Sequence, residues 1–137
     1  MILLDTCALL WLAAGLAPRP GVTEALEAAR AEDGVLVSPI SAWEIAQKEK
    51  KRPGALGLAA PPLAVFRRIA AQPGVRLMPL TPEILAAAVE LDGLATEDPV
   101  DRMIVATTLA MGARLLTADA RMLDFRPART IDYGRPG

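Results

Sequence analysis

Short apolar runs alternate along this chain with segments of helical periodicity, and this alternation limits the possible folds most strongly. Residues 2–4, 35–37, 75–78 and 114–116 have the length and composition of strands, and residues 130–131 are expected to add an edge strand. Helices between successive strands are typical of a parallel sheet, because the chain must cross back before each new strand. We therefore predict an α/β fold with a central parallel sheet of four to five short strands and helices on both faces.

The helical segments have recognisable start and stop signals. Thr81-Pro82 and Asp98-Pro99 each place a capping side chain before a proline that suits the first helical turn. A third helix is expected to open at Ser38 or Ser41. The remaining helices are predicted at residues 7–14, 22–31, 63–71 and 120–123, and a loop rich in Gly, Pro and Ala is predicted at residues 53–62.

The size and charge of the chain favour one ordinary domain. We expect residues 1–137 to form a single domain, since 137 residues suffice for a proper core. The chain has 15 basic and 16 acidic residues and a formal net charge of -1. This balance gives no support to tight non-specific DNA binding, although it leaves room for a local basic stripe.

The composition excludes several kinds of catalytic chemistry. The chain has no histidine, which rules out zinc–histidine sites, Ser-His-Asp triads and histidine acid–base catalysis. Cys7 is the only cysteine, so no internal disulfide can form and a cytoplasmic location is expected. The longest apolar run, residues 8–14, is too short to span a bilayer, and no membrane association is expected.

Four carboxylates occupy positions at which metal ligands are expected. Asp5 closes the first strand, Glu44 lies early in a helix, Asp101 lies in the first turn of another helix, and Asp119 follows the fourth strand. Each also has a structural interpretation, since each can cap a helix, and Ser41 to Glu44 matches a capping box. Taken singly, each carboxylate fits the structural interpretation at least as well as the metal-ligand interpretation.

Taken together, these carboxylates favour a metal site. The C-terminal ends of parallel strands open on one edge of the sheet, where Asp5 and Asp119 would meet, and the helix that carries Glu44 would begin at the same edge. Carboxylates in one crevice repel one another, and a divalent cation relieves that repulsion. Because oxygen is the only ligand available, Mg²⁺ is expected, with Mn²⁺ as an alternative.

These residues also carry a family resemblance. The chain resembles the PIN-domain ribonucleases of the VapC toxin type over almost its whole length. The matching pieces occur in the order of the family and are Leu3-Leu4-Asp5-Thr6 with Trp11, Ser38-Pro39-Ile40-Ser41-Ala42-Trp43-Glu44-Ile45, Asp98-Pro99-Val100-Asp101-Arg102-Met103-Ile104-Val105-Ala106 and Leu115-Leu116-Thr117-Ala118-Asp119. One departure is Glu97, since many relatives have a histidine there.

The resemblance implies a fold, a site and an activity. The fold would be a PIN-like three-layer α/β/α sandwich. Asp5, Glu44, Asp101 and Asp119 would be the catalytic and metal-binding quartet, supported by Thr6, Thr117 and Asp98. The activity would be Mg²⁺-dependent RNA cleavage by the toxin of a toxin–antitoxin pair, and the partners would be an RNA substrate, a cognate antitoxin and a second copy in a homodimer.

Other residues have two interpretations. A basic cluster can track an RNA backbone or only complement helix ends and keep the protein soluble, and it comprises Lys48, Lys50, Lys51, Arg52, Arg67 and Arg68. Trp11, Trp43 and Cys7 are expected in the core, and Arg102 is expected to pair with a neighbouring acid.

Two other function classes stay open from the sequence. One is a Mg²⁺-dependent DNA nuclease of the 5′ type, or another phosphohydrolase. The other is a catalytically silent PIN-like module that binds protein or RNA. The intact quartet argues against the silent module, because such a module would usually have lost an acid.

Overall fold

A single five-stranded sheet forms the centre of the computed structural model, which describes residues 1–136. The strands are β1 (Ile2–Leu4), β2 (Val35–Val37), β3 (Val75–Leu77), β4 (Arg114–Thr117) and β5 (Arg129–Asp132). Their order is β3-β2-β1-β4-β5, and all neighbouring pairs are parallel. The predicted parallel sheet is confirmed, and the expected edge strand is confirmed with longer bounds.

Helices connect the strands as the alternation predicts. They are α1 (Thr6–Ala13), α2 (Val22–Ala31), α3 (Pro39–Lys51), α4 (Pro62–Ala70), α5 (Pro82–Val89), α6 (Pro99–Met111) and α7 (Ala120–Leu123). Within residues 1–136, no helix is both long enough and apolar enough to cross a membrane.

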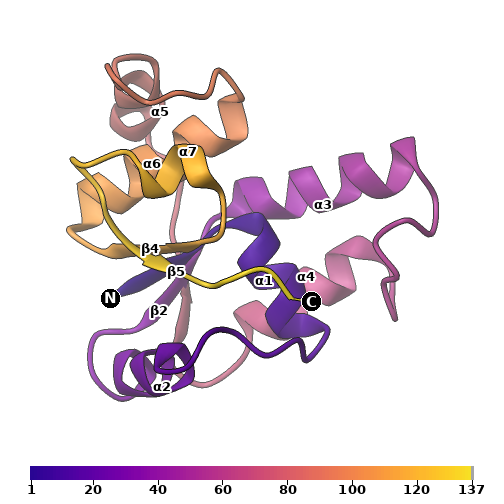
Figure 1. Cartoon of the computed structure of the whole chain (residues 1–137). Coiled ribbons are helices and arrows are strands. Elements are labelled where there is room, and N and C mark those ends of the chain that lie inside the picture. The colour runs from indigo at the N-terminus through magenta and orange to yellow at the C-terminus, as the bar shows by residue number, and fades with distance from the viewer. Residues whose placement is uncertain (137) are drawn as a thin grey trace.

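The helices cover both faces of the sheet (Figure 1). Alternate side chains of each strand point to opposite faces, so Ile2 and Leu4 pack with α1, α2 and α4, whereas Leu3 packs with α5, α6 and α7. The predicted three-layer α/β/α sandwich is confirmed. Helix α3 packs against α4 and extends beyond the sheet (Figure 1), which leaves much of its surface open to solvent.

Helix α3 begins at Pro39, and this corrects one sequence interpretation. Ser38 is the N-cap, and its hydroxyl accepts a hydrogen bond from the Ile40 amide at 3.3 Å. Ser41 therefore lies inside the helix, where its hydroxyl is hydrogen-bonded to Thr6 at 2.9 Å. The predicted capping box between Ser41 and Glu44 is wrong, because the proline after Ser38 already fixes the first turn.

Arg102 also differs from its prediction. Its guanidinium donates hydrogen bonds of 2.8 to 3.2 Å to the backbone carbonyls of Ala88, Val89, Leu91 and Thr96. These carbonyls lie at the C-terminal end of α5 and in the segment after it, where the helix leaves them without partners of its own. Arg102 is therefore not bonded to an acid and instead fastens α5 to α6.

The two central strands, β1 and β4, define a crevice. The helix that follows β1 covers one face of the sheet, whereas the helix that follows β4 covers the other. Ligands of open α/β sheets bind where such connections diverge, outside the C-terminal ends of the strands. Asp5 lies at this point, and its amide donates a hydrogen bond to Leu116 of β4 at 3.1 Å.

Candidate active site

Asp5 lies at the floor of the crevice, directly after β1. Its side chain is buried, with one oxygen accepting from the Ala8 amide at 2.7 Å and the other accepting from the Thr117 hydroxyl at 2.5 Å. Burial raises the pKa of Asp5 to about 6, and Glu44 and Asp119 add to the rise, whereas the two hydrogen bonds oppose it. Asp5 is thus the N-cap of α1, and burial destabilises its ionised form.

The end of β4 supplies a second acid beside Asp5. Thr117 accepts a hydrogen bond from the Asp119 amide at 3.0 Å while it donates to Asp5, so its hydroxyl fixes both segments. Asp119 is the N-cap of α7 and accepts from the Arg121 amide at 2.8 Å. The Arg121 side chain lowers the pKa of Asp119, which is therefore ionised at neutral pH.

The first turn of α6 supplies a third acid. Burial and, after it, the negative charge of Asp98 raise the pKa of Asp101 to about 6. Thr96 donates a hydrogen bond to Asp101 at 3.3 Å and accepts one from the Asp98 amide at 3.1 Å. Asp98 itself is exposed and caps α6 through the Val100 amide at 2.9 Å.

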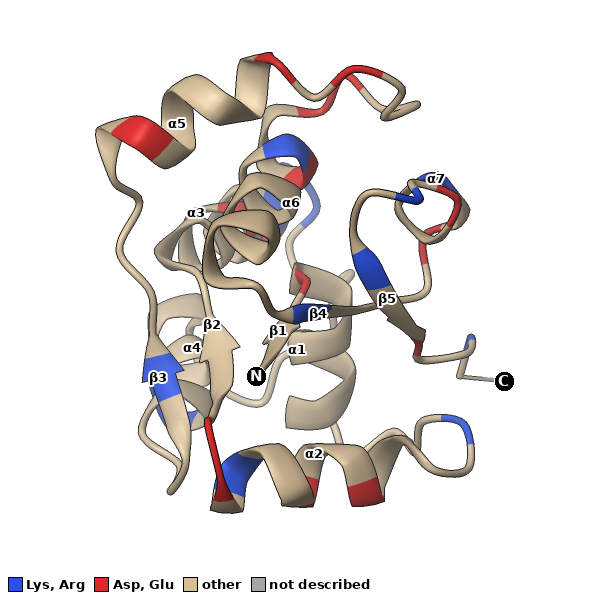
Figure 2. Ribbon diagram, turned by 90° about the vertical axis from the view of Figure 1, so that its left-hand side faces the viewer, with Lys and Arg blue, Asp and Glu red and all other residues tan. Residues whose placement is uncertain are grey.

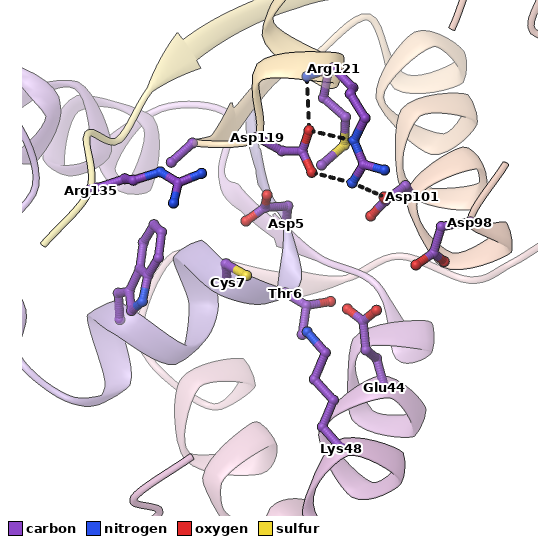
Figure 3. A pocket seen from close by; sticks show the side chains of 13 residues that line it. Asp5, Thr6, Cys7, Glu44, Lys48, Asp98, Asp101, Asp119, Arg121 and Arg135 are labelled. Atoms are coloured by element: carbon purple, nitrogen blue, oxygen red, sulfur yellow. Dashed lines mark hydrogen bonds and ion pairs between the residues drawn. The ribbon is translucent and has the colours of Figure 1, made fainter. Parts of the chain in front are cut away.

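Helix α3 supplies the fourth acid. Glu44 lies on its second turn and lines the same cavity as Asp5, Asp101 and Asp119, with Thr6 between the helices (Figure 3). Acidic positions accordingly gather where β1 ends, where α6 begins and beside α7 (Figure 2). The four predicted acids and Asp98 and Thr6 are thus brought to one cavity. Thr117 does not line the cavity itself, but it donates a hydrogen bond to Asp5, which does.

Arg121 is a residue of this site that the sequence interpretation missed. Its guanidinium lies 2.7 Å from Asp119 and 3.5 Å from Asp101, and it spans the two carboxylates (Figure 3). An arginine two positions after an acid at a helix start was the available signal. Thr96 was also missed, because its hydrogen bonds with Asp98 and Asp101 depend on how the loop before α6 folds.

The acids line one cavity, but they do not form a complete set of metal ligands in this structure. Among residues 1–136, no three Asp, Glu or Cys side chains stand close enough together to hold a metal ion. The site still fits a hard divalent cation, because its donors are oxygens and two of its buried acids have raised pKa values. Mg²⁺ is usually bound by one or two carboxylates together with water and substrate phosphates, and this arrangement offers such ligands.

Two expectations about core residues are wrong. Trp43 is 56% exposed, because α3 extends past the sheet and turns this side chain to solvent. Cys7 is half-buried and lines the acidic cavity, and burial and the charge of Asp5 raise the pKa of its thiol to about 11. Trp11 packs partly as expected, with its ring 5.1 Å from that of Tyr133.

The predicted basic cluster is divided by the structure. Lys48 lines the acidic cavity, and Lys48 and Lys51 line an adjoining groove. Arg68 faces a different cavity, beside α1, and donates to the Ala13 carbonyl at 3.2 Å. The residues that line neither the acidic cavity nor the adjoining groove are Lys50, Arg52, Arg67 and Arg68.

Comparison with known proteins shows the family of this chain. The family model of the PIN domain matches residues 2–126. The chain belongs to the PIN-domain family. The resemblance seen in the sequence is therefore confirmed, and it extends over nearly all of the PIN fold described above.

Individual PIN-domain relatives match over most of their length. The chain is 34% identical to Ribonuclease VapC22 of Mycobacterium tuberculosis, with 95% of each chain covered. The crystal structure of VapBC2 from Rickettsia felis, bound to a promoter DNA fragment, matches with a TM-score of 0.70 and 14% identity, covering 98% of this chain and 100% of that one. The VapC20 toxin of Mycobacterium tuberculosis, which cleaves the sarcin-ricin loop, matches with a TM-score of 0.57 and 19% identity, covering 84% and 87%.

Proposed function

We propose that this protein is a Mg²⁺-dependent endoribonuclease that acts as the toxin of a toxin–antitoxin pair. The observation that carries the proposal is the convergence of Asp5, Glu44, Asp101 and Asp119 on one cavity of a PIN-domain chain. The 34% identity to a protein named as a ribonuclease over 95% of both chains supports RNA as the substrate.

The acids of the cavity differ in how strongly burial raises their pKa values, and we assign their roles from this difference. Burial raises the pKa of both Asp5 and Asp101, so these two acids have the most to gain from a bound cation and we assign them as the inner ligands. When bound, Mg²⁺ supplies positive charge to the scissile phosphate and lowers the pKa of the water that attacks it. Mn²⁺ has the same preference for oxygen ligands and is an alternative.

Other side chains of the cavity orient these groups. Glu44 and Asp119 are assigned to hold water or a second ion near the scissile phosphate, and Asp98 is an outer contributor. Thr117 fixes the rotamer of Asp5 by its hydrogen bond, and Thr6 is held by Ser41 at the cavity wall. Lys48 brings positive charge to the cavity, where it offsets repulsion between the acids and the RNA backbone.

The partners follow from the relatives. Structures that match this fold include VapBC2 from Rickettsia felis and a toxin–antitoxin complex from Klebsiella pneumoniae, which supports a cognate antitoxin as a partner. That the antitoxin covers the acidic cavity is our own proposal. A homodimer in the cytoplasm is part of the same proposal. The net charge of -1 is consistent with a protein that needs its local basic residues, rather than its overall charge, to hold RNA.

The test is cleavage of total RNA by the purified protein with Mg²⁺ or Mn²⁺, with EDTA, and with Asp101→Asn. Cleavage that requires metal and is lost in the variant supports the proposal. Cleavage of nicked or flapped DNA but not RNA favours the 5′-nuclease alternative. If no nucleic acid is cleaved and calorimetry detects no divalent metal binding, the protein is a silent binding module.

A further inference from the structure

A solvent-exposed tryptophan stands on the wall of a groove beside the acidic cavity. The groove is lined by residues of α3 and of the start of α6, namely Trp43, Glu44, Gln47, Lys48, Lys51, Asp98, Pro99 and Val100. Glu44, Lys48 and Asp98 also line the acidic cavity, so the groove and the cavity are continuous. A ligand that has a phosphate in the cavity can therefore extend along the groove.

The ring of Trp43 belongs to neither hydrophobic core cluster of residues 1–136. Its side chain is 56% exposed, whereas Ser41 and Ile45 of the same helix are fully buried. Trp11 differs, since it packs against Tyr133. A single exposed apolar side chain is ordinary on a protein surface, so it is the place of Trp43 in a groove beside the acidic cavity, and not its exposure alone, that points to a ligand.

The charges around Trp43 suit a nucleic-acid strand. Residues 43, 47 and 51 are spaced four apart on α3 and share one face of the helix, so Lys51 lies two turns beyond Trp43. Lys48 lies one turn beyond Glu44 and is seen beside it at the cavity (Figure 3). The groove thus combines an aromatic ring and two lysines that can hold phosphates with acids that it shares with the cavity, and Lys48 lines both.

We propose that Trp43 is a specificity residue that stacks on an unpaired base next to the scissile phosphate, while Lys48 and Lys51 hold the adjoining phosphates. Aromatic platforms beside basic residues bind single strands in this way, because every base has a face to stack and no pairing partner blocks it. A base-paired duplex keeps its bases inside its own stack and cannot use Trp43. The inference rests on the proposed ribonuclease function and narrows its substrate to RNA that is unpaired at this position.

The test is the affinity of the full chain for a fluorescent 12-nucleotide single-stranded RNA and for a duplex of equal length, measured by anisotropy in EDTA at low salt. Trp43→Ala should weaken single-strand binding about fivefold or more, while Trp43→Phe should keep most of it. Duplex binding should change little in either variant. Val89→Ala is the control, since Val89 is 73% exposed on α5, away from the groove.

The outcomes separate this inference from the proposed function. Hydrolysis of bis(p-nitrophenyl) phosphate with Mn²⁺ should be equal in wild type and Trp43→Ala, because that small diester needs the acids alone. If the wild type binds no RNA and does not hydrolyse the diester, the proposed function fails. If the wild type binds single strands and Trp43→Ala binds them equally well, this inference alone is overturned. It is also overturned if Trp43→Ala changes the mass in size-exclusion chromatography without changing RNA affinity, since Trp43 would then serve self-association.

Discussion

Thr117 donates a hydrogen bond of 2.5 Å to the carboxylate of Asp5, a residue 112 positions earlier in the chain. The bond joins the C-terminal ends of β4 and β1, the two strands between which the helical connections diverge. It also favours the ionised form of Asp5, against the burial that raises its pKa to about 6. One hydroxyl therefore positions the proposed metal ligand and helps to keep it charged.

Thr117→Val removes this hydroxyl but keeps the shape of the side chain. The free energy of unfolding at pH 7 should fall by about 1–3 kcal/mol, because a buried carboxylate loses a partner. RNA cleavage should fall about 10- to 100-fold, as expected when the support of a ligand is lost. Urea unfolding and a cleavage assay measure the two effects. Thr117→Ser should retain most of both, and unchanged cleavage by Thr117→Val would contradict the positioning role.

The buried acids predict how the stability of the metal-free protein depends on pH. The pKa of Asp5 rises from 3.8 to about 6 on folding, so between these values the folded state binds more protons than the unfolded state. The contribution of Asp5 to the free energy of unfolding is therefore fully present below about pH 3.8, and it is lost as the pH rises through about 6. Asp101 has a shift of the same sign, whereas the lowered pKa of Asp119 acts below its ordinary value of 3.8.

Asp5→Asn isolates this effect. The variant should gain stability relative to wild type as the pH rises from about 4.5 to about 7.5, by roughly 1–3 kcal/mol, because it has no carboxylate to ionise. Urea unfolding in EDTA at several pH values gives the difference between the two proteins. A difference that is constant with pH would show that Asp5 has the same pKa in both states. The variant should fold and should not cleave RNA.

Arg121 competes with a divalent cation for two carboxylates. Its guanidinium lies between Asp119 and Asp101, so a cation that binds these oxygens must displace it. Arg121→Ala should therefore bind Mn²⁺ several-fold more tightly than wild type in a calorimetric titration. Arg126→Ala, at another exposed arginine, is the control and should leave the affinity unchanged. Weaker binding in Arg121→Ala would mean that Arg121 holds the acids in position for the metal.

Gly74 predicts a local requirement of the fold. Its φ is +77°, and a Cβ there would lie 2.6 Å from the backbone oxygen of Arg30, which cannot easily move. Gly74→Ala should lower the free energy of unfolding by about 2–4 kcal/mol, from strain and from the clash. Gly93→Ala is a matched control, since its φ is +87° with nothing within 4 Å. It should cost only about 1 kcal/mol. If denaturant unfolding shows that both variants lose the same free energy of unfolding, the contact with Arg30 contributes nothing to the effect.

Local patterns were sufficient to predict the elements of this fold. The strands β1 and β2 are short apolar runs, whereas β5 has the mostly polar sequence Arg-Thr-Ile-Asp and was expected only at residues 130–131. Capping residues before prolines gave the starts of α5 and α6 correctly. The four acids were found because each follows a strand or lies early in a helix, and the edge geometry of a parallel sheet brings such positions together. Their roles as caps and as cavity residues coexist, as Asp5 and Asp119 show.

The predictions that failed depend on contacts that no local pattern records. Trp43 lies in an apolar run, but only the extension of α3 beyond the sheet leaves it exposed. Arg102 finds four carbonyls at the end of α5 because α5 and α6 pack together, so no acid near it in sequence could have indicated its partners. The bridge from Arg121 to Asp101 likewise joins residues from two separate helices.

The most direct measurement is calorimetric titration of Mn²⁺ into wild type, Asp5→Asn, Asp101→Asn and Glu97→Gln, with RNA cleavage recorded on the same samples. Glu97 is exposed beside the cap of α6 and controls for the loss of one acid nearby. We predict that wild type and Glu97→Gln bind Mn²⁺ and cleave RNA. The two Asp→Asn variants should bind at least about tenfold more weakly and should not cleave. If metal binding and cleavage persist in both Asp→Asn variants, Asp5 and Asp101 do not hold the catalytic metal ion.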